Sequence, residues 1–163
     1  MDVSDVEPQV LQLAEALRAR GLRMASAESC TGGLIAAACT AVAGSSDWFE
    51  RGFVTYSNEA KTELLGVDAA LIAGHGAVSR EVAAAMAEGA LAHARADLAV
   101  AVTGIAGPGG AVPGKPVGTV WLAVARRGEA ARPQLLQLAG DRRAVRAQTV
   151  ALALQRLLQV AAE

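Results

Sequence analysis

The sequence predicts an α/β/α sandwich, a three-layer fold with a mixed central sheet. Amphipathic helical stretches alternate with short runs of apolar and β-branched residues, which is typical of an α/β protein. Two strand-like runs near the C-terminus follow one another without a helix between them, which indicates a mixed sheet. No repeat, linker or low-complexity segment divides the chain, so we expect one domain over residues 1–163.

The chain is expected to begin with a helix, because Pro8 suits a first helical turn and apolar residues recur at helical spacing up to Gly21. Residues 22–27 are predicted to be a short buried strand. A glycine-containing turn follows, and residues 34–42 then form a nearly all-apolar helix. These elements make up a strand, turn and helix unit.

The middle of the chain is predicted to hold one further strand and a short helix. Residues 43–51 are expected to be a loop, and residues 52–57 a strand because of their aromatic and β-branched content. Asn58 is expected to cap a short helix that carries Lys61. Residues 66–78 are expected to be a loop.

The last part of the chain begins with a helix that Ser79 caps and that ends near Arg95. Residues 97–107 are rich in β-forming residues, and the Gly/Pro stretch at 107–118 indicates an ordered loop. The remaining elements are two strands, 118–127 and 133–140, and a final amphipathic helix that Asp141 caps.

Composition excludes several classes of protein. Hydrophobic residues make up 53% of the chain, which excludes a disordered segment. The formal charge is −1 and only five residues are aromatic, which argues against nucleic-acid binding. No apolar run is long enough to span a bilayer and the N-terminus is acidic, so we expect no membrane contact and a cytoplasmic location. Cys30 and Cys39 are expected to be reduced and buried, and no His or Cys spacing indicates a metal site.

Three polar or glycine-rich segments follow predicted strands: residues 28–33, 55–61 and 103–110. Ligands of such sheets bind beyond the carboxyl ends of strands, so these segments are candidates for a site. The first, ESCTGG, has the features of a phosphate-binding turn, because its glycines come just before a helix N-terminus. A tight structural turn explains this segment equally well. Its candidate binding residues are Glu28, Ser29, Thr31 and Gly32.

Only two of the 15 basic residues are lysines, Lys61 and Lys115. A desolvated amine can lose its proton and act as a base, which a guanidinium cannot do. Lys61 lies fifteen positions after Ser46, with Tyr56 between them, and this set is suited to nucleophilic catalysis by a serine and a lysine. The competing interpretation makes Ser46 a cap, Tyr56 a core residue and the two lysines ordinary surface cations.

The start of the last helix carries Arg142, Arg143 and Arg146, where the helix dipole disfavours cations. Arg142 and Arg146 can clamp a phosphate from one helix face, or they form a solvated surface. Thr103 and Gly104 end an apolar strand ahead of the glycine-rich loop, where they are placed to contact a ligand.

Six segments, in this order and spacing, resemble the CinA C-terminal domain family: AESCTGG, GSSDWFERGFVTYSNEAK, GAVS, TGIAGPGG, KPVGTVW and GDRRAVR. The stand-alone members of that family are nicotinamide-nucleotide amidohydrolases. The resemblance covers nearly the whole chain. It implies hydrolysis of nicotinamide mononucleotide to nicotinate mononucleotide and ammonia in pyridine-nucleotide salvage, without a metal or other cofactor, in a protein that is commonly a homodimer.

The resemblance also implies roles for individual residues. It points to Ser46 as the nucleophile, Lys61 as its base and Tyr56 as their hydrogen-bonding companion, while Ser29 and Ser45 remain competing nucleophiles. Ser29 and Thr103 would hold the substrate, and Arg142 would bind its phosphate. An alternative function is that of a non-catalytic nucleotide-binding partner associated with competence or DNA damage.

Overall fold

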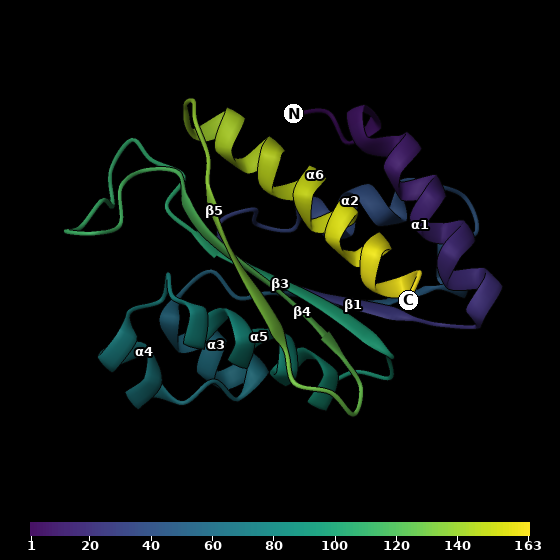
Figure 1. Cartoon of the computed structure of the whole chain (residues 1–163), viewed down its shortest axis with the longest axis horizontal. Coiled ribbons are helices and arrows are strands. Elements are labelled where there is room, and N and C mark those ends of the chain that lie inside the picture. Colours follow the sequence, from purple (N-terminus) through teal and green to yellow (C-terminus); the bar gives the residue numbers. More distant parts are fainter.

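One mixed five-stranded sheet, in the order β2-β1-β3-β4-β5, runs through the middle of the molecule (Figure 1). The computed structural model describes residues 1–163. The first three strands in this order are parallel, and β4 and β5 are each antiparallel to their preceding neighbour. The strands are β1 (Met24–Glu28), β2 (Phe49–Val54), β3 (Leu98–Gly104), β4 (Thr119–Arg126) and β5 (Arg132–Gln137). The predicted mixed sheet is confirmed.

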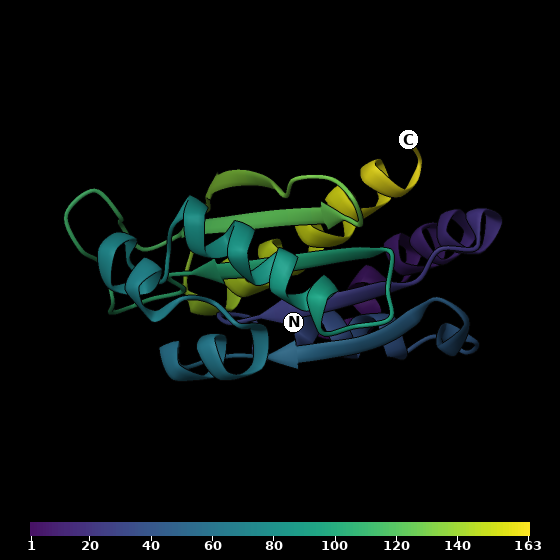
Figure 2. The same cartoon turned by 90° about the horizontal axis from the view of Figure 1, so that it is seen from below.

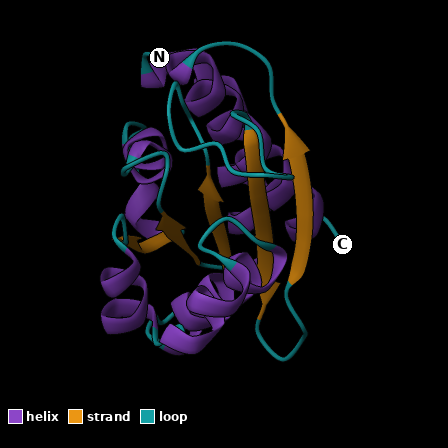
Figure 3. Cartoon of the chain, turned by 90° about the vertical axis from the view of Figure 1, so that its left-hand side faces the viewer, coloured by secondary structure: helices purple, strands orange, loops and turns teal.

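Helices cover both faces of the sheet, which confirms the three-layer sandwich (Figures 1 and 3). One face carries α1 (Glu7–Arg20), α2 (Leu34–Thr40) and α6 (Arg142–Ala161), and the other carries α3 (Asn58–Leu65), α4 (Ala69–His75) and α5 (Arg80–Ala92). Two short 3-10 helices, η1 (Val3–Val6) and η2 (Ser45–Asp47), complete the chain. Each helical layer has its own core, of 27 and 16 buried residues. No helix is both long enough and apolar enough to cross a bilayer.

Small residues bring the α3–α5 layer close to the sheet and bring α3 close to α5. The sheet face beneath α5 is built largely from alanines, including Ala25, Ala99 and Ala101. At Gly89 of α5, a Cβ atom would lie 2.1 Å from the carbonyl oxygen of Leu65, so only glycine permits this approach of the two helices. This contact fixes α3, the helix that carries Lys61, against α5 within the same layer.

Most predicted helix ends are confirmed. Gly21 ends α1 in the left-handed conformation, with φ of 62°. Ser79 and Asp141 cap α5 and α6 through their side-chain oxygens, as expected. The cap of α3 is Ser57 rather than Asn58, because the Ser57 hydroxyl accepts the hydrogen bond from the Ala60 amide.

Three predicted boundaries are wrong. The strand expected at 52–57 begins at Phe49 and ends at Val54, because the backbone pairs with β1 from residue 49 onward. The loop expected at 66–78 contains α4, which Asp68 caps by accepting a hydrogen bond from the amide of Ala70. Helix α5 also ends earlier than expected, at Ala92.

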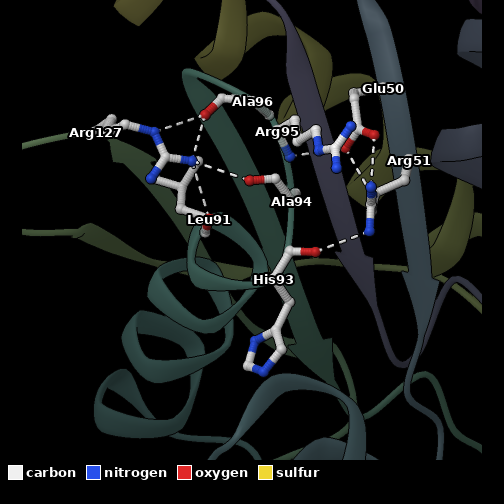
Figure 4. Close-up of polar contacts among 8 residues, drawn as sticks. All are labelled: Glu50, Arg51, Leu91, His93, Ala94, Arg95, Ala96 and Arg127. Carbon is white, nitrogen blue, oxygen red and sulfur yellow. Dashed lines mark hydrogen bonds and ion pairs between the residues drawn. The ribbon is translucent and has the colours of Figure 1, made fainter.

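The amino ends of the parallel strands are closed by a hydrogen-bonded cluster (Figure 4). Arg127 donates to the carbonyl oxygens of Leu91, Ala94 and Ala96, which satisfies acceptors at and beyond the end of α5. Arg51 bridges the carboxylate of Glu50 and the carbonyl of His93 (Figure 4). These contacts are structural, and they leave the other end of the sheet for a ligand.

Arrows β1 and β2 point toward that other end, where α3 and the long loop of residues 105–118 lie (Figure 2). Strand β3 runs parallel to β1, so its carboxyl end also lies there. The three polar segments that follow these strands are therefore adjacent, as the sheet rule predicts.

Candidate active site

A cavity of about 240 Å³ lies where the three strand-following segments meet. We call it the Ser29–Lys61 cavity. Six residues expected from the sequence line it: Ser29, Tyr56, Lys61, Thr103, Gly104 and Arg142. Five lining residues were not expected to do so: Cys30, Asn58, Ala77, Val78 and Ala106.

Lys61 is 1% exposed, and its amine is held by several oxygen atoms. Nζ lies 3.1 Å from Ser29 Oγ and 3.1 Å from the carbonyl oxygen of Thr55. The carbonyls of Tyr56 and Ser57 lie slightly farther from Nζ, at 3.2 and 3.4 Å. These three carbonyls belong to the turn between β2 and α3, which surrounds the Lys61 side chain. The amine is therefore fixed in one position beside the Ser29 hydroxyl.

Burial lowers the pKa of Lys61 below its usual value, because the charged ammonium loses solvent. A weaker influence acts in the opposite direction, because the Glu59 carboxylate favours the charged form. No carboxylate lies among the residues that line the cavity. A buried amine with a lowered pKa next to a serine hydroxyl is a suitable general base.

Ser46 is not brought to Lys61, contrary to the expected pairing. It is exposed and lies in η2, just before β2, while Lys61 follows the other end of that strand. Six strand residues at ~3.3 Å each separate the two ends by about 20 Å. The Trp48 carbonyl next to η2 accepts from the Met24 amide at the start of β1, whereas Ser29 follows the end of β1. Ser45 lies in the same 3-10 helix as Ser46, which leaves Ser29 as the serine beside the lysine.

The ESCTGG turn was a candidate phosphate-binding turn, but the N-terminus of α2 that follows it binds a carboxylate of the protein itself. Glu28 is 1% exposed, and its Oε1 accepts from the Thr31 hydroxyl and from the Ile35 amide at 2.9 Å. Its Oε2 accepts from the Ala36 amide at 3.0 Å. The N-terminus of α2 is thus neutralised by the protein itself. Glu28, Thr31 and Gly32 shape the turn beneath the cavity and do not line it.

Arg146 supports the same turn from α6. Its Nε donates to the carbonyl of Cys30 at 3.1 Å, and Nη2 donates to the carbonyl of Thr31 at 3.3 Å. The residue expected to clamp a phosphate is therefore bonded to the backbone that follows Ser29. It fixes the position of the serine turn relative to α6.

Arg142 separates the Ser29–Lys61 cavity from a larger neighbouring one of about 820 Å³. We call the larger space the arginine cavity, because Arg142, Arg143 and Arg146 line it together with the 105–118 loop. Arg142 Nη1 donates to the carbonyl of Gly107 at 2.9 Å, and Nη2 lies 3.4 Å from the hydroxyl of Tyr56. Arg143 is exposed and makes no hydrogen bond or ion pair. Two adjoining cavities with cations at their junction suit an elongated ligand with an anionic end.

Thr103 and Gly104 form the wall of the cavity at the end of β3. The Thr103 hydroxyl donates to the carbonyl of Ala77 at 2.9 Å, which ties β3 to the segment ahead of α5. A Cβ atom at Gly104 would lie 2.6 Å from Cγ2 of Val120, so a side chain there would collide with β4. Two of the unexpected lining residues, Ala77 and Val78, lie in the GAVS segment, which is one of the segments that resemble the family. Asn58 was expected to be a helix cap, so its place in the cavity was not predicted.

Cys30 and Cys39 are free and buried, as predicted. Burial raises the pKa of the Cys30 thiol to about 11, so this thiol is un-ionised at neutral pH although it lines the cavity. No three His, Cys, Asp or Glu side chains lie close enough together to hold a metal ion. Ser29 is thus the lining residue best suited to attack an electrophile.

Comparison with known proteins gives consistent results. The family model of the CinA C-terminal domain matches residues 7–161. The chain is 56% identical over 149 residues to the nicotinamide-nucleotide amidohydrolase PncC of Escherichia coli strain K12, covering 91% of this chain and 90% of that protein. It is 54% identical over 154 residues to the protein of the same name from Pseudomonas putida, covering 93% and 94%. A crystal structure of the competence/damage inducible protein CihA from Agrobacterium tumefaciens superposes with a TM-score of 0.92 at 46% identity, covering 96% of this chain and 95% of that one.

Proposed function

This chain belongs to the CinA C-terminal domain family, and on that premise we propose that it hydrolyses the carboxamide of nicotinamide mononucleotide to nicotinate mononucleotide and ammonia. This reaction places the protein in pyridine-nucleotide salvage. The observation that carries the proposal is the 3.1 Å contact between Lys61 Nζ and Ser29 Oγ at the Ser29–Lys61 cavity. The relatives are named nicotinamide-nucleotide amidohydrolases, which supports this substrate.

We assign Ser29 as the nucleophile and Lys61 as the base. In the structure Lys61 Nζ donates to Ser29 Oγ, and the Ser29 hydroxyl donates to the carbonyl of Tyr56. In the reacting state we assign two N–H groups of the neutral amine to the carbonyls of Thr55 and Tyr56, and its lone pair to the Ser29 hydroxyl, which turns toward it. Lys61 takes the serine proton as Oγ bonds to the carboxamide carbon. It then gives that proton to the nitrogen as the C–N bond breaks and ammonia leaves. A water molecule then gives a proton to the same amine and attacks the resulting ester, and the amine returns the proton to Ser29 Oγ as the C–O bond breaks and the acid leaves.

Stabilisation of the oxyanion is assigned to the serine turn. Cys30 directly follows Ser29 and lines the cavity, and its backbone N–H makes no hydrogen bond in the structure. Donors of this kind next to a nucleophile stabilise the tetrahedral intermediate. The Gly32 amide donates to the Ser29 carbonyl at 3.1 Å, which fixes the peptide plane that carries the Cys30 N–H, and Arg146 holds the Cys30 carbonyl that follows.

The substrate phosphate is assigned to the junction of the two cavities. Arg142 lines both of them, and Arg143 adds a guanidinium that has no protein partner. The nicotinamide then lies in the Ser29–Lys61 cavity, with the ribose between it and the phosphate. Arg146 is a positioning residue in this assignment.

The proposal includes an oligomeric state and a location that come from the resemblance and the composition. We expect a cytoplasmic homodimer without a nucleic-acid partner, and the formal charge of −1 supports the last point. Light scattering in solution measures the oligomeric state directly, and a monomer would contradict this part of the proposal.

The test of the proposed function is ammonia release from nicotinamide mononucleotide by the purified protein, with the protein carrying Lys61→Met as the matched control. We expect release of one ammonia per nicotinate mononucleotide formed by the wild-type protein, and a large loss in the control. If the two proteins release ammonia at equal rates, the activity comes from a contaminant. Binding of the nucleotide without turnover would favour the alternative of a nucleotide-binding partner.

A further inference from the structure

The Ser29–Lys61 cavity offers no negative charge to a cationic ligand. Lys61 and Arg142 are its ionisable basic groups, and no Asp or Glu lines it. Glu28 lies next to Ser29 in sequence, but its carboxylate is engaged by the N-terminus of α2 and by Thr31. The nicotinamide ring of the proposed substrate is joined to ribose through its ring nitrogen and therefore carries a positive charge. With Lys61 neutral as the base, the cationic ring thus enters a space whose one protein charge, on Arg142, has the same sign.

Tyr56 is the one aromatic residue that lines this cavity. Its side chain is 63% exposed, so it contributes little to the core. The hydroxyl lies 3.4 Å from Nη2 of Arg142, which leaves the ring as the part available to a ligand. The face of an aromatic ring attracts a cation that lies within ~6 Å of its centre. Among the lining side chains, Tyr56 therefore offers the favourable electrostatic interaction for a pyridinium ring.

We propose that Tyr56 is a specificity-determining residue whose ring stacks on the pyridinium cation and selects the oxidised mononucleotide over its reduced 1,4-dihydro form. The inference rests on the proposed function for the identity of the substrate. The two nucleotides share the carboxamide, the ribose and the phosphate. They differ in the charge of the ring, which is neutral in the reduced form. The preference for the oxidised form therefore depends on the ring of Tyr56 and not on its hydroxyl.

The test measures binding rather than turnover, because the two carboxamides differ in intrinsic reactivity. Dissociation constants of both nucleotides are measured by calorimetry on the full chain carrying Ser29→Ala, alone and combined with Tyr56→Leu or Tyr56→Phe. The quantity compared is the ratio of the two dissociation constants. Tyr56 is exposed, so both substitutions are expected to leave the fold intact, which circular dichroism checks.

We expect Tyr56→Leu to reduce the preference for the oxidised nucleotide by roughly 2- to 30-fold, and Tyr56→Phe to preserve it. Equal weakening of both nucleotides by Tyr56→Leu would overturn the inference, as would a loss in Tyr56→Phe as large as that in Tyr56→Leu. Failure to bind either nucleotide would overturn it as well. The proposed function fails separately, if the wild-type protein releases no ammonia from the oxidised nucleotide.

Discussion

Lys61 Nζ lies 3.1 Å from Ser29 Oγ, although the two residues are 32 positions apart in the sequence. Two different strand ends create this contact, since Ser29 follows β1 and Lys61 lies on the helix after β2. Parallel pairing of β1 with β2 brings those ends together. Arg146 holds the serine turn and three backbone carbonyls hold the amine, so both partners are fixed before a substrate arrives.

The first prediction concerns pH. Burial lowers the pKa of Lys61 from its usual value of 10.5, so the amine becomes neutral at a lower pH than a free lysine. We expect kcat/KM to rise with pH along a single ionisation and to level off once the amine is neutral. In the pH range between the two pKa values the unfolded chain binds the proton and the folded chain does not, so the free energy of unfolding also rises with pH.

Lys61→Arg serves as the control for this profile, because arginine keeps the charge but does not release its proton. We expect kcat to fall by roughly 10²- to 10⁴-fold in this variant and the ionisation to disappear from the profile. A profile that is flat in the wild-type protein, or unchanged in the variant, would show that Lys61 is not the base.

The second prediction concerns the phosphate. Charge-assisted hydrogen bonds contribute about 1.5 to 3 kcal/mol each, so loss of the phosphate weakens transition-state binding by at least tenfold. We expect kcat/KM for nicotinamide riboside to be lower than that for the mononucleotide by this margin. Arg143→Ala is expected to raise KM for the mononucleotide and to leave the riboside unaffected. Equal kcat/KM values for the two substrates would show that the phosphate does not bind at the junction of the cavities.

The third prediction assigns a structural role to Glu28. Replacement by Gln removes the charge at the N-terminus of α2 and places an amide where the Ala36 and Ile35 N–H groups need acceptors. We expect a loss of roughly 2 to 4 kcal/mol in the free energy of unfolding, which lowers Tm by roughly 5 to 15 °C. Glu63→Gln, at an exposed position of α3, is the matched control and should leave Tm unchanged. A Glu28→Gln protein as stable as this control would indicate that the carboxylate does not stabilise the turn.

The fourth prediction is that activity survives prolonged treatment with EDTA. The proposed base and nucleophile are side chains, and the chain brings no three metal-ligating residues together. Ammonia release is measured before and after treatment and after addition of Zn²⁺ or Mg²⁺. Loss of activity that either ion restores would overturn the serine and lysine mechanism.

Fold class and the general position of the site follow from sequence patterns. Alternating helical and strand periodicities predicted the sandwich, and the rule for strand ends predicted that residues 28–33, 55–61 and 103–110 meet. Caps with clear chemistry, such as Ser79 and Asp141, were also predicted correctly. Periodicity and helix caps depend on residues close together in the sequence, so sequence patterns predict them.

The partner of Lys61 depends on long-range geometry instead. The family resemblance pointed to Ser46, which lies fifteen positions before Lys61 in the sequence. An extended strand lies between Ser46 and Lys61, and it carries them to opposite ends of the sheet. The roles of Glu28 and Arg146 were hidden for a similar reason, since both bind backbone groups that sequence patterns do not reveal.

Attack of Ser29 on the carboxamide, with Lys61 as its base, is tested by kcat for ammonia release from nicotinamide mononucleotide. The comparison is between Ser29→Ala and Ser46→Ala, which make the same chemical change at the two ends of the sheet. Our account predicts that Ser29→Ala lowers kcat by at least about 10³-fold and that Ser46→Ala stays within about threefold of the wild-type value. Activity that survives in Ser29→Ala and is lost in Ser46→Ala would contradict it.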